Sequence, residues 1–287
     1  MQKTPPDNRL EGTTPIRQAQ LVMLGILKDI DRVCKKHNLT YWLAHGTLLG
    51  AYRKNCFIPW DDDLDIEMPR EDFDVLINLP RSEFSEHVFL DLTSEVEGDF
   101  YCKVKDRYSK RIDGNIPDSD KAFNTIFIDI FPVKKFHFMR KVLSRIRMLI
   151  PPYTPPSIKN AKTLSKKIKR LFVNVLYYVL TYSGLQFIIK GLSLLGPKNV
   201  WAYDLKRPRH YHFYDSWIFP LNQIKFEDSY FPIPAHSEKI LATMYGKNFM
   251  TPLQDNHHLN EDIFPTIPCK HPEARDWYKD FPETKKD

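Results

Sequence analysis

The sequence predicts an α/β fold, because amphipathic helices and short strands follow one another through the first 133 residues. One long segment repeats apolar residues at spacings of three and four, which is typical of a helix that faces a core. Other segments alternate apolar and polar residues and stop at Pro, Gly or Asn, as strands do. With 287 residues, 42% of them apolar, the chain can bury a substantial core in one large domain or two small ones.

The first predicted helix begins at Thr14-Pro15, a capping residue followed by Pro at the first helical position, and ends near His37-Asn38. Its apolar stripe consists of Ile16, Ala19, Met23, Ile26, Ile30 and Val33. Two more helices are predicted in "GTLLGAYR", a turn leading into a helix, and in "REDFDVLINL" after Pro69. The predicted strands are "TYWLA", "LDIEM", "HVFLDL", "FYCKVKD" and "TIFIDIF".

The chain divides into three predicted regions. Residues 1–135 form an α/β core, residues 136–200 a basic and largely helical insertion, and residues 201–287 a C-terminal segment that packs on the core. The C-terminal segment is rich in aromatic residues and Pro. It contains one clear helix, "SEKILATMYG", which Gly246 closes.

The insertion combines dense Lys and Arg with large apolar residues. Leu171 to Ile189 carries no charge, which is borderline for a membrane span, but several polar residues and a Gly within it weaken that interpretation. We favour a basic amphipathic pair that lies on an anionic membrane surface, as a peripheral contact. The alternative is a core helix with a solvated basic face.

Charge and cysteine content narrow the partners and the compartment. The net charge of +6 predicts an anionic partner, and the absence of a recognition signature argues against nucleic acid. The four cysteines are widely spaced and form no CxxC pair, so a zinc site or disulfide framework is not expected and a reducing compartment fits better. The N-terminus has no apolar signal segment. We therefore expect a cytoplasmic protein, with membrane contact on the inner face of the cytoplasmic membrane.

The segment "GAYRKNCFIPWDDDLDIEMPR", residues 50–70, gathers four aspartates beside apolar residues. Adjacent carboxylates repel and raise one another's pKa, which favours a cation among them. On a strand, Asp61, Asp63 and Asp65 would share one face. Their oxygen ligands would select Mg²⁺ or Mn²⁺, which can polarise a phosphoryl oxygen.

Other interpretations of the aspartates are a solvated acidic turn and a glycosidase pair of carboxylates. An EF-hand fails, because Ile66 stands where its loop needs Gly. The flanking "GTLLG" favours phosphate chemistry, since Gly46 and Gly50 frame Thr47 after a strand and at the start of a helix. Backbone amides and a hydroxyl there can hold an anion. A phosphate-binding turn shortly before an Asp strand is what phosphoryl transfer requires.

The long segment "LAHGTLLGAYRKNCFIPWDDDLDIEMPREDF" resembles the signature of the LicD family. LicD proteins resemble the nucleotidyltransferase superfamily of DNA polymerase β type, which implies a mixed sheet with flanking helices. Gly46-Thr47 stands at the Gly-Ser turn of that superfamily and keeps the hydroxyl. Asp63 and Asp65 correspond to its D-x-D pair, and Asp61 is a further acid.

Three further segments resemble the same family. "IFIDIFP" supplies Asp129 as the carboxylate of the third strand, followed by a Phe-Pro pair typical of LicD proteins. "FYCKVKD" is similar to the basic strand, which implies phosphate-facing roles for Lys103 and Lys105. "FEDSYFPIPAHSEKILATMYGKNFMTP" matches the C-terminal block. The resemblance covers residues 16–133 and 224–252.

The resemblance implies transfer of a phospho-alcohol from a CDP-linked donor to a glycan hydroxyl, with CMP released. Phosphocholine from CDP-choline is the best-known bacterial case, and it modifies teichoic acid or lipopolysaccharide sugars; animal relatives handle ribitol phosphate. The expected partners are thus a CDP-linked alcohol and a glycan or lipid-linked glycan of the cell envelope. The alcohol itself does not follow from family membership.

The expected catalytic roles fall on four carboxylates. Asp63 and Asp65 would hold the Mg²⁺ or Mn²⁺ ions, and Asp61 would complete the ligand set. Asp129 would ligate a second ion or accept the proton of the acceptor hydroxyl.

The expected substrate contacts lie on the turn, the following helix and the basic strand. Gly46 and Thr47 would cradle phosphate, and Arg53 would bind it through two hydrogen bonds, unless Arg53 is an ordinary surface residue. Lys103 and Lys105 would contact phosphate, the alternative being that they are solvated lysines.

The C-terminal region contains two clusters that invite a binding role. An aromatic cage for a quaternary ammonium group could form, although such rings more often belong to a core. Its members would be Trp201, Tyr203, Tyr211, Phe213, Tyr214 and Trp217. The histidines lack a zinc spacing, so a zinc site is not expected. They are His210, His212, His257 and His258.

Two other functions compete with phospho-alcohol transfer. A nucleotidyltransferase would release pyrophosphate instead of CMP. A non-catalytic scaffold would bind glycan or membrane, but the intact aspartates argue against it, because a degenerate relative should have lost at least one of them.

Overall fold

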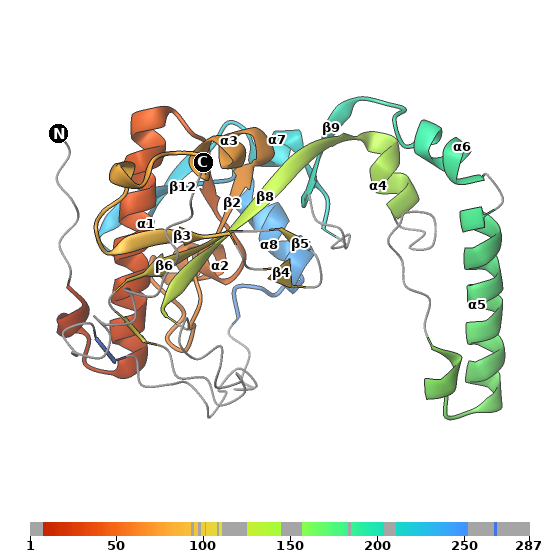
Figure 1. Ribbon diagram of the computed structural model, residues 1–287, viewed down its shortest axis with the longest axis horizontal. Coiled ribbons are helices and arrows are strands. Elements are labelled where there is room, and N and C mark those ends of the chain that lie inside the picture. Colours follow the sequence, from red (N-terminus) through yellow and green to blue (C-terminus); the bar gives the residue numbers. More distant parts are fainter. Residues whose placement is uncertain are drawn as a thin grey trace.

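A mixed sheet curls through the body of the protein and helices flank it (Figure 1). The computed structural model describes residues 8–92, 95–96, 99–100, 102–107, 109–110, 125–144, 157–182, 185–203, 211–251 and 267–268. Strands and helices are interspersed and the main sheet has both parallel and antiparallel pairs, which confirms the predicted mixed, α+β type of architecture.

The first helix confirms the sequence pattern at both ends. Thr14 caps it by accepting a hydrogen bond from the Arg17 amide at 3.2 Å, and Asn38 ends it in the left-handed conformation. The described helices are α1 (Pro15–His37), α2 (His45–Lys54), α3 (Arg70–Leu76), α4 (Phe138–Ser144), α5 (Leu164–Tyr182), α6 (Leu185–Leu192), α7 (Asp215–Ile218) and α8 (Ser237–Tyr245), with short turns η1 (Arg9–Glu11), η2 (Arg81–Glu83) and η4 (Ile158–Asn160).

All five predicted strands are present, as β1, β2, β3, β6 and β8. The later strands β9 to β12 were not predicted. The described strands are β1 (Trp42–Leu43), β2 (Asp65–Pro69), β3 (Val88–Asp91), β4 (Glu95–Val96), β5 (Asp99–Phe100), β6 (Cys102–Asp106), β7 (Ser109–Lys110), β8 (Phe127–His137), β9 (Lys198–Tyr203), β10 (Phe213–Tyr214), β11 (Asn222–Phe226), β12 (Ser229–Ile233) and β13 (Ile267–Pro268).

The main sheet has the strand order β1-β2-β8-β6-β3, and β9 joins it by pairing with the second half of β8 and with β10. β2 and β8 run parallel, while the other pairs in this sheet are antiparallel. β11 and β12 form a separate hairpin. Because β2, β8 and β6 are neighbours, the aspartate strand, the "IFIDIFP" strand and the basic strand lie side by side.

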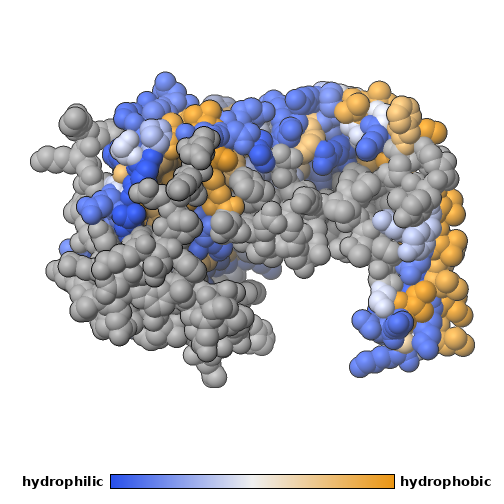
Figure 2. All heavy atoms as spheres, in the orientation of Figure 1, coloured by the Kyte–Doolittle hydropathy of each residue, from blue (hydrophilic) through white to orange (hydrophobic). Residues whose placement is uncertain are grey.

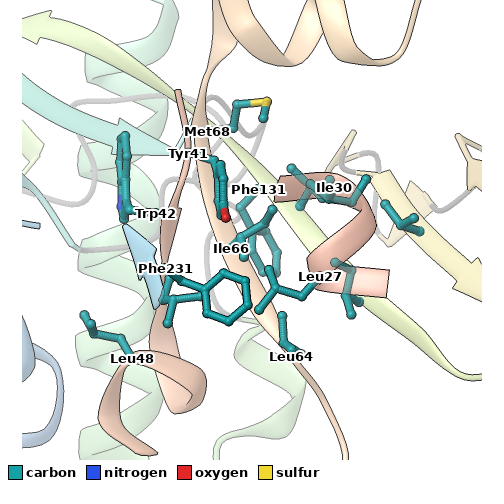
Figure 3. Close-up of a cluster of buried hydrophobic side chains, with 14 of the residues drawn as sticks. Leu27, Ile30, Tyr41, Trp42, Leu48, Leu64, Ile66, Met68, Phe131 and Phe231 are labelled. Carbon is teal, nitrogen blue, oxygen red and sulfur yellow. The ribbon is translucent and has the colours of Figure 1, made fainter. Parts of the chain in front are cut away.

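One face of the sheet is apolar and forms the core. Ile66 on β2, Ile130 on β8 and Val104 on β6 are fully buried, and each alternates with a polar or aromatic residue on the opposite face. Helix α1 covers this apolar face with Leu27 and Ile30, as Figure 3 shows. The burial of these side chains holds the strands in register, because a slip by one residue would turn the apolar set toward the site.

The aspartate segment enters the sheet later than predicted. β2 begins at Asp65, so residues 61–64 precede the strand and the predicted single face of Asp61, Asp63 and Asp65 is not a strand face. The reason is that β1 ends at Leu43 and the chain turns into α2, which leaves the stretch before Asp65 without a strand on that side. The Asp61 amide instead donates to the Ile58 carbonyl at 2.9 Å and closes a turn.

An arm extends from the sheet and carries α4, α5 and α6 (Figure 1). β8 and β9 form its stem, and the predicted boundaries at 135/136 and 200/201 fall inside these strands. The uncharged run predicted as a borderline span is divided between α5 and α6. Of the helices in the described ranges, none is long and apolar enough to cross a membrane.

Candidate active site

The polar face of the sheet carries a row of charges across four strands. Asp65 on β2 pairs in register with Asp129 on β8, which pairs with Lys103 on β6, which pairs with Asp91 on β3. Residues that pair in register point to the same face, so three carboxylates and one ammonium lie along one line, with Lys103 between Asp129 and Asp91. The two parallel strands thus bring together acids that lie 64 positions apart in the sequence, as the family resemblance implied.

Both predicted lysines lie in this row of charges or next to it, and each has an acidic partner. Lys103 Nζ lies 3.2 Å from Asp129 Oδ1 and also 3.2 Å from the centre of the Phe127 ring. Lys105 Nζ lies 2.5 Å from an oxygen of Asp91, and both side chains are largely buried. The lysines balance the charge of the acids in the absence of substrate, and contact of either with phosphate remains a prediction.

Asp61 is a largely buried carboxylate with two other carboxylates close to it. Its Oδ2 atom is buried and receives no hydrogen bond from the described residues. Burial, and then the nearby carboxylates of Asp63 and Asp62, raise the pKa of Asp61 to about 8. A cation between these acids would remove the repulsion, so the cluster has the chemistry of a divalent-ion site.

The cluster is not closed around such an ion. Within the described part of the chain, no three His, Cys, Asp or Glu side chains converge closely enough to hold a metal on their own. This arrangement fits Mg²⁺ or Mn²⁺ bound partly through waters and substrate phosphates, since such ions rarely need a complete cage of protein ligands.

The chain between α2 and β2, residues 55–64, is called the aspartate loop here, and the two glycines of "GTLLG" let it lie against α2. A side chain at Gly50 would place its Cβ 2.6 Å from the Cys56 carbonyl oxygen, and one at Gly46 would place it 2.9 Å from Asp61 Oδ2. The backbone contact at Gly50 cannot shift easily, so glycine is required there. Gly46 opens the space in which the Asp61 carboxylate lies.

Thr47 fastens α2 to the aspartate strand. Its side chain is buried, and its Oγ1 accepts a hydrogen bond from the Asp65 amide at 2.9 Å. The hydroxyl therefore sets the position of Asp65 directly. The phosphate contact expected of Gly46-Thr47 remains a prediction; the Thr47 side chain could contribute its hydroxyl proton to such a contact.

Arg53 lies at the other end of α2 and faces the C-terminal segment. It donates to the carbonyl oxygens of Phe249, at 2.7 Å from Nε, and of Thr251, at 3.1 Å from Nη2. Burial lowers the pKa of its guanidinium. This geometry gives Arg53 a role in joining α2 to the segment after α8, and its predicted contact with phosphate would require these bonds to open.

A partly buried ion pair that the sequence did not reveal holds the aspartate loop from outside. Arg17 on α1 binds both carboxylate oxygens of Glu227, at 2.9 and 2.6 Å, and Glu227 also accepts from the Phe57 amide at 3.1 Å. Glu227 occupies the β11–β12 turn with a φ of 58°. The hairpin therefore ties α1 to the chain that leads into the aspartates.

Gln20, one helical turn further along α1, supports the same loop. Its Nε2 atom donates to the carbonyl oxygens of Ile58 at 3.1 Å and of Asp61 at 3.0 Å. The position of Gln20 among the apolar residues of α1 is a signal in the sequence that could have indicated this role. A buried side-chain amide needs polar partners, which here are backbone carbonyl groups.

A network of hydrogen bonds around Glu67 lies next to the row of charges, on the same face of the sheet. Glu67, two positions after Asp65 on the same face of β2, accepts hydrogen bonds from Trp42 Nε1 at 2.8 Å and from the Tyr203 hydroxyl. The Tyr203 hydroxyl oxygen also lies 2.8 Å from His45 Nε2, and the two rings stack. Burial raises the pKa of Glu67, and the two hydrogen bonds partly offset this. Strand alternation after Asp65 predicts the face of Glu67, but its partners come from distant strands.

His45 has the conformation that begins α2. Its φ of 45° is uncommon for a residue with a side chain, and it reverses the chain between β1 and the helix. The stacked Tyr203 ring and the hydrogen bond to Tyr203 compensate for this conformation. The start of the "GTLLG" helix thus depends on β9, a strand from the far end of the insertion.

The predicted aromatic cage is not assembled from all six rings. Trp201, Tyr203 and Phe213 are buried, and Tyr203 hydrogen-bonds Glu67, so these belong to the core. Tyr214 and Trp217 pack edge to face, with the ammonium of Lys141 3.6 Å from the centre of the Tyr214 ring.

Tyr245 on α8 is an additional site residue that the sequence did not reveal. The residue is 44% exposed, and partial removal from water, followed by the negative charges of Asp65, Asp61 and Asp63, raises the pKa of its phenol. Among the predicted histidines, His212 is buried, while His210, His257 and His258 lie outside the described residues.

Comparison with known proteins finds a family model and several relatives that are similar to the part of the chain that carries this site. Residues 38–144, which include the aspartates and Lys103, match the family model described as LicD/FKTN/FKRP, nucleotidyltransferase domain. The chain is 31% identical over 116 residues to the lipopolysaccharide cholinephosphotransferase LicD of Haemophilus influenzae, covering 40% of this chain and 43% of that protein.

Two other relatives match similar shares of this chain. An uncharacterised protein of Rickettsia prowazekii is 33% identical over 129 residues, 41% of this chain and 47% of that one. Mannosyltransferase regulator 4 of Saccharomyces cerevisiae is 26% identical over 114 residues, 40% of this chain and 9% of that protein. The chain therefore spans less than half the length of each of these relatives.

Proposed function

We propose that the protein is a LicD-type enzyme that transfers a phospho-alcohol, in the first instance phosphocholine, from a CDP-linked donor to a hydroxyl of a cell-surface glycan. The match of residues 38–144 to the family model and the similarity to a lipopolysaccharide cholinephosphotransferase support this proposal. We also assign the nucleotidyltransferase fold to the sheet of β2, β8 and β6 with α2 at its edge. The observation that carries the proposal is the in-register pair of Asp65 and Asp129, next to the crowded carboxylates of Asp61 and Asp63.

In the proposed reaction the hydroxyl oxygen of the acceptor attacks the β-phosphorus of the donor. A phosphorus–oxygen bond forms to the glycan while the bond to the oxygen bridging the two phosphates breaks, and CMP leaves with that oxygen. The hydroxyl proton passes to a carboxylate, a role that we assign to Asp129. Lys103, 3.2 Å from Asp129, would move between this carboxylate and the donor phosphate.

We assign Asp63 and Asp65 as the main ligands of Mg²⁺ or Mn²⁺, with Asp61 and Asp129 as further ligands. The bound ion would neutralise the diphosphate and polarise a phosphoryl oxygen. Gly46 is assigned to phosphate binding through its backbone. The chain's own contribution is then to hold the carboxylates, through Thr47, Gln20 and the Arg17–Glu227 pair, at positions that a hydrated diphosphate can bridge.

CMP release tests the proposal directly. Purified protein with Mg²⁺ and a lysate glycan acceptor is incubated with CDP-choline, CDP-ethanolamine, CDP-glycerol or CDP-ribitol. We expect release from one donor and a loss of at least about a hundredfold in the Asp63→Asn, Asp65→Asn variant. The matched control is Asp74→Asn, Asp228→Asn, which removes two exposed carboxylates from α3 and from the β11–β12 turn and should keep full activity.

The other outcomes identify the competing functions. If the protein releases pyrophosphate from a nucleoside triphosphate and the same double variant does not, the function is nucleotidyl transfer and not phospho-alcohol transfer. The description of the family model names a nucleotidyltransferase domain. A folded protein that releases neither product from any donor would leave the scaffold interpretation.

A further inference from the structure

The arm presents an apolar stripe that the rest of the described molecule leaves uncovered. Figure 2 shows it as the orange outer edge of α5. Leu164, Ile168 and Phe172 have exposed fractions of 74%, 60% and 68%. The stripe continues along the helix through Leu171, Val175, Tyr178 and Val179. At 100° per residue these seven side chains fall within an arc of about 120°, so they form one face of α5 from end to end.

The same surface continues beyond α5. Phe187 and Ile188 on α6 are 84% and 55% exposed, and Leu194 and Leu195 after α6 are also exposed. Isolated exposed apolar residues need no explanation, but a continuous set along two successive helices marks a binding surface. We call these residues of α5, α6 and 194–195 the arm surface.

The charges around the arm surface have a single sign. Lys166, Lys167 and Lys169 are exposed on α5 outside the stripe, and Lys167 lies next to its edge. Residues 130–203 contain 14 Lys and Arg with no Asp or Glu. The rest of the chain has 28 Lys and Arg against 36 Asp and Glu. An anionic surface would therefore attract the arm and repel the body, which fixes the orientation of the molecule on it.

From this combination we infer that the arm surface docks on an anionic lipid bilayer, with α5 lying in the plane of the interface. A narrow apolar face flanked by lysines is the pattern of an interfacial helix, and the described helices do not qualify as membrane spans. A second copy of the chain is a poorer occupant, because pairing two arms would bring their lysines together. The inference does not depend on the proposed transferase activity.

Co-sedimentation with vesicles tests the inference. We expect the protein to sediment with vesicles of equal parts phosphatidylcholine and phosphatidylglycerol, and at least about tenfold less with phosphatidylcholine alone. The Ile168→Gln, Phe172→Gln variant should bind the anionic vesicles about tenfold more weakly. Lys166→Gln, Lys167→Gln, Lys169→Gln should show a similar loss at low salt.

Two controls keep the result specific to the arm. Val75→Gln, Tyr230→Gln removes comparable exposed apolar groups from the body, and it should bind as the unchanged protein does. Asp63→Asn, Asp65→Asn should also bind normally, so vesicle binding and catalysis can fail separately. Circular dichroism checks that α5 is intact, since Gln is a good helix former.

Three results would overturn the inference. The first is no sedimentation with either kind of vesicle, and the second is equal binding by the Ile168→Gln, Phe172→Gln variant and the unchanged protein. The third is a dimer in light scattering that this variant converts to monomer, which would assign the arm surface to a second copy of the chain.

Discussion

Helices α1 and α5 are both long and amphipathic, yet one is built into the body and the other stands apart on the arm (Figure 1). The apolar stripe of α1 is buried against the sheet, whereas that of α5 is more than half exposed at most positions. Their polar faces differ as well. Lys28 and Lys35 on α1 pair with Asp228 and Asp31, while the basic face of α5 has no acidic residue in its own sequence.

The contrast between α1 and α5 indicates that the polar face of an amphipathic helix carries information about the partner of its apolar face. The polar face of α1 carries charges of both signs, and these form ion pairs within the protein. Such pairs are typical of a helix that packs on the core of the same protein. A face of one sign repels itself and is suited to an external surface of the opposite sign. The predictions below test how far the body and the arm are independent.

The largest expected effect separates catalysis from docking. Asp65→Asn should lower CMP release by about a hundredfold, because it removes a carboxylate from the pair with Asp129, and should leave vesicle binding unchanged. CMP assays and co-sedimentation of the same preparation measure both. A parallel loss of both activities would show that body and arm are not separable.

The same substitution in the two regions should affect stability very differently. Ile66→Ala, at a fully buried position of β2, should lower the free energy of unfolding by about 2–5 kcal/mol, since it opens a cavity in the core. Ile168→Ala, at an exposed position of α5, should change it by less than about 0.5 kcal/mol. Urea titration of both variants measures this. Similar losses would mean that the arm surface is covered in solution.

A smaller effect is expected from the ion pair that holds the aspartate loop. Glu227→Gln should destabilise the protein by about 1–2 kcal/mol, because the Arg17 guanidinium loses a partly buried partner. Lys28→Gln, which breaks the neighbouring and more exposed pair with Asp228, should cost less than about 0.5 kcal/mol. Equal costs for the two variants would contradict a special role for Glu227.

The smallest effect concerns protons and metal in the body. Without divalent ions the pKa of Asp61 is about 8 in the folded protein and 3.8 in the unfolded chain, so the folded state holds a proton that unfolding releases. Stability should therefore fall as the pH rises from about 4 to about 8. Asp61→Asn should remove this fall and be more stable than the unchanged protein at pH 8 by about 1 kcal/mol, after allowance for partial exposure.

Mg²⁺ provides the control for that prediction. It should stabilise the unchanged protein at pH 8 more than the Asp61→Asn variant, measured by thermal unfolding with EDTA or Mg²⁺. An equal shift in both proteins would argue against Asp61 as a ligand.

Local patterns predicted much of the body. The cap at Thr14, the alternation after Asp65 and the apolar run around Asp129 each depend on neighbouring residues, and the structure confirms the elements they define. The family resemblance assigned both Asp65 and Asp129 to one site, and the structure brings the two residues together as an in-register pair.

Long-range partners account for what the sequence did not reveal. Arg53 faces carbonyl oxygens almost 200 positions away, and Glu227 binds Arg17 across 210 positions. No local spacing encodes such contacts. The prediction that Asp61 and Asp63 lie on a strand is wrong, because it rests on the alternation of residues alone. A strand also needs a neighbouring strand with which to pair, and alternation does not guarantee one.

β8 is one unbroken strand, with Asp129 near its beginning and α4 of the arm directly after its last residue, His137. Eight residue steps of an extended chain separate the two residues, about 27 Å. A paired strand of that length sets the distance between the arm and the row of charges. If the arm rests on a bilayer, the reacting phosphorus is held at a set height above it. Acceptor hydroxyls would then be selected by how far their sugar reaches from its lipid anchor, as well as by their chemical identity.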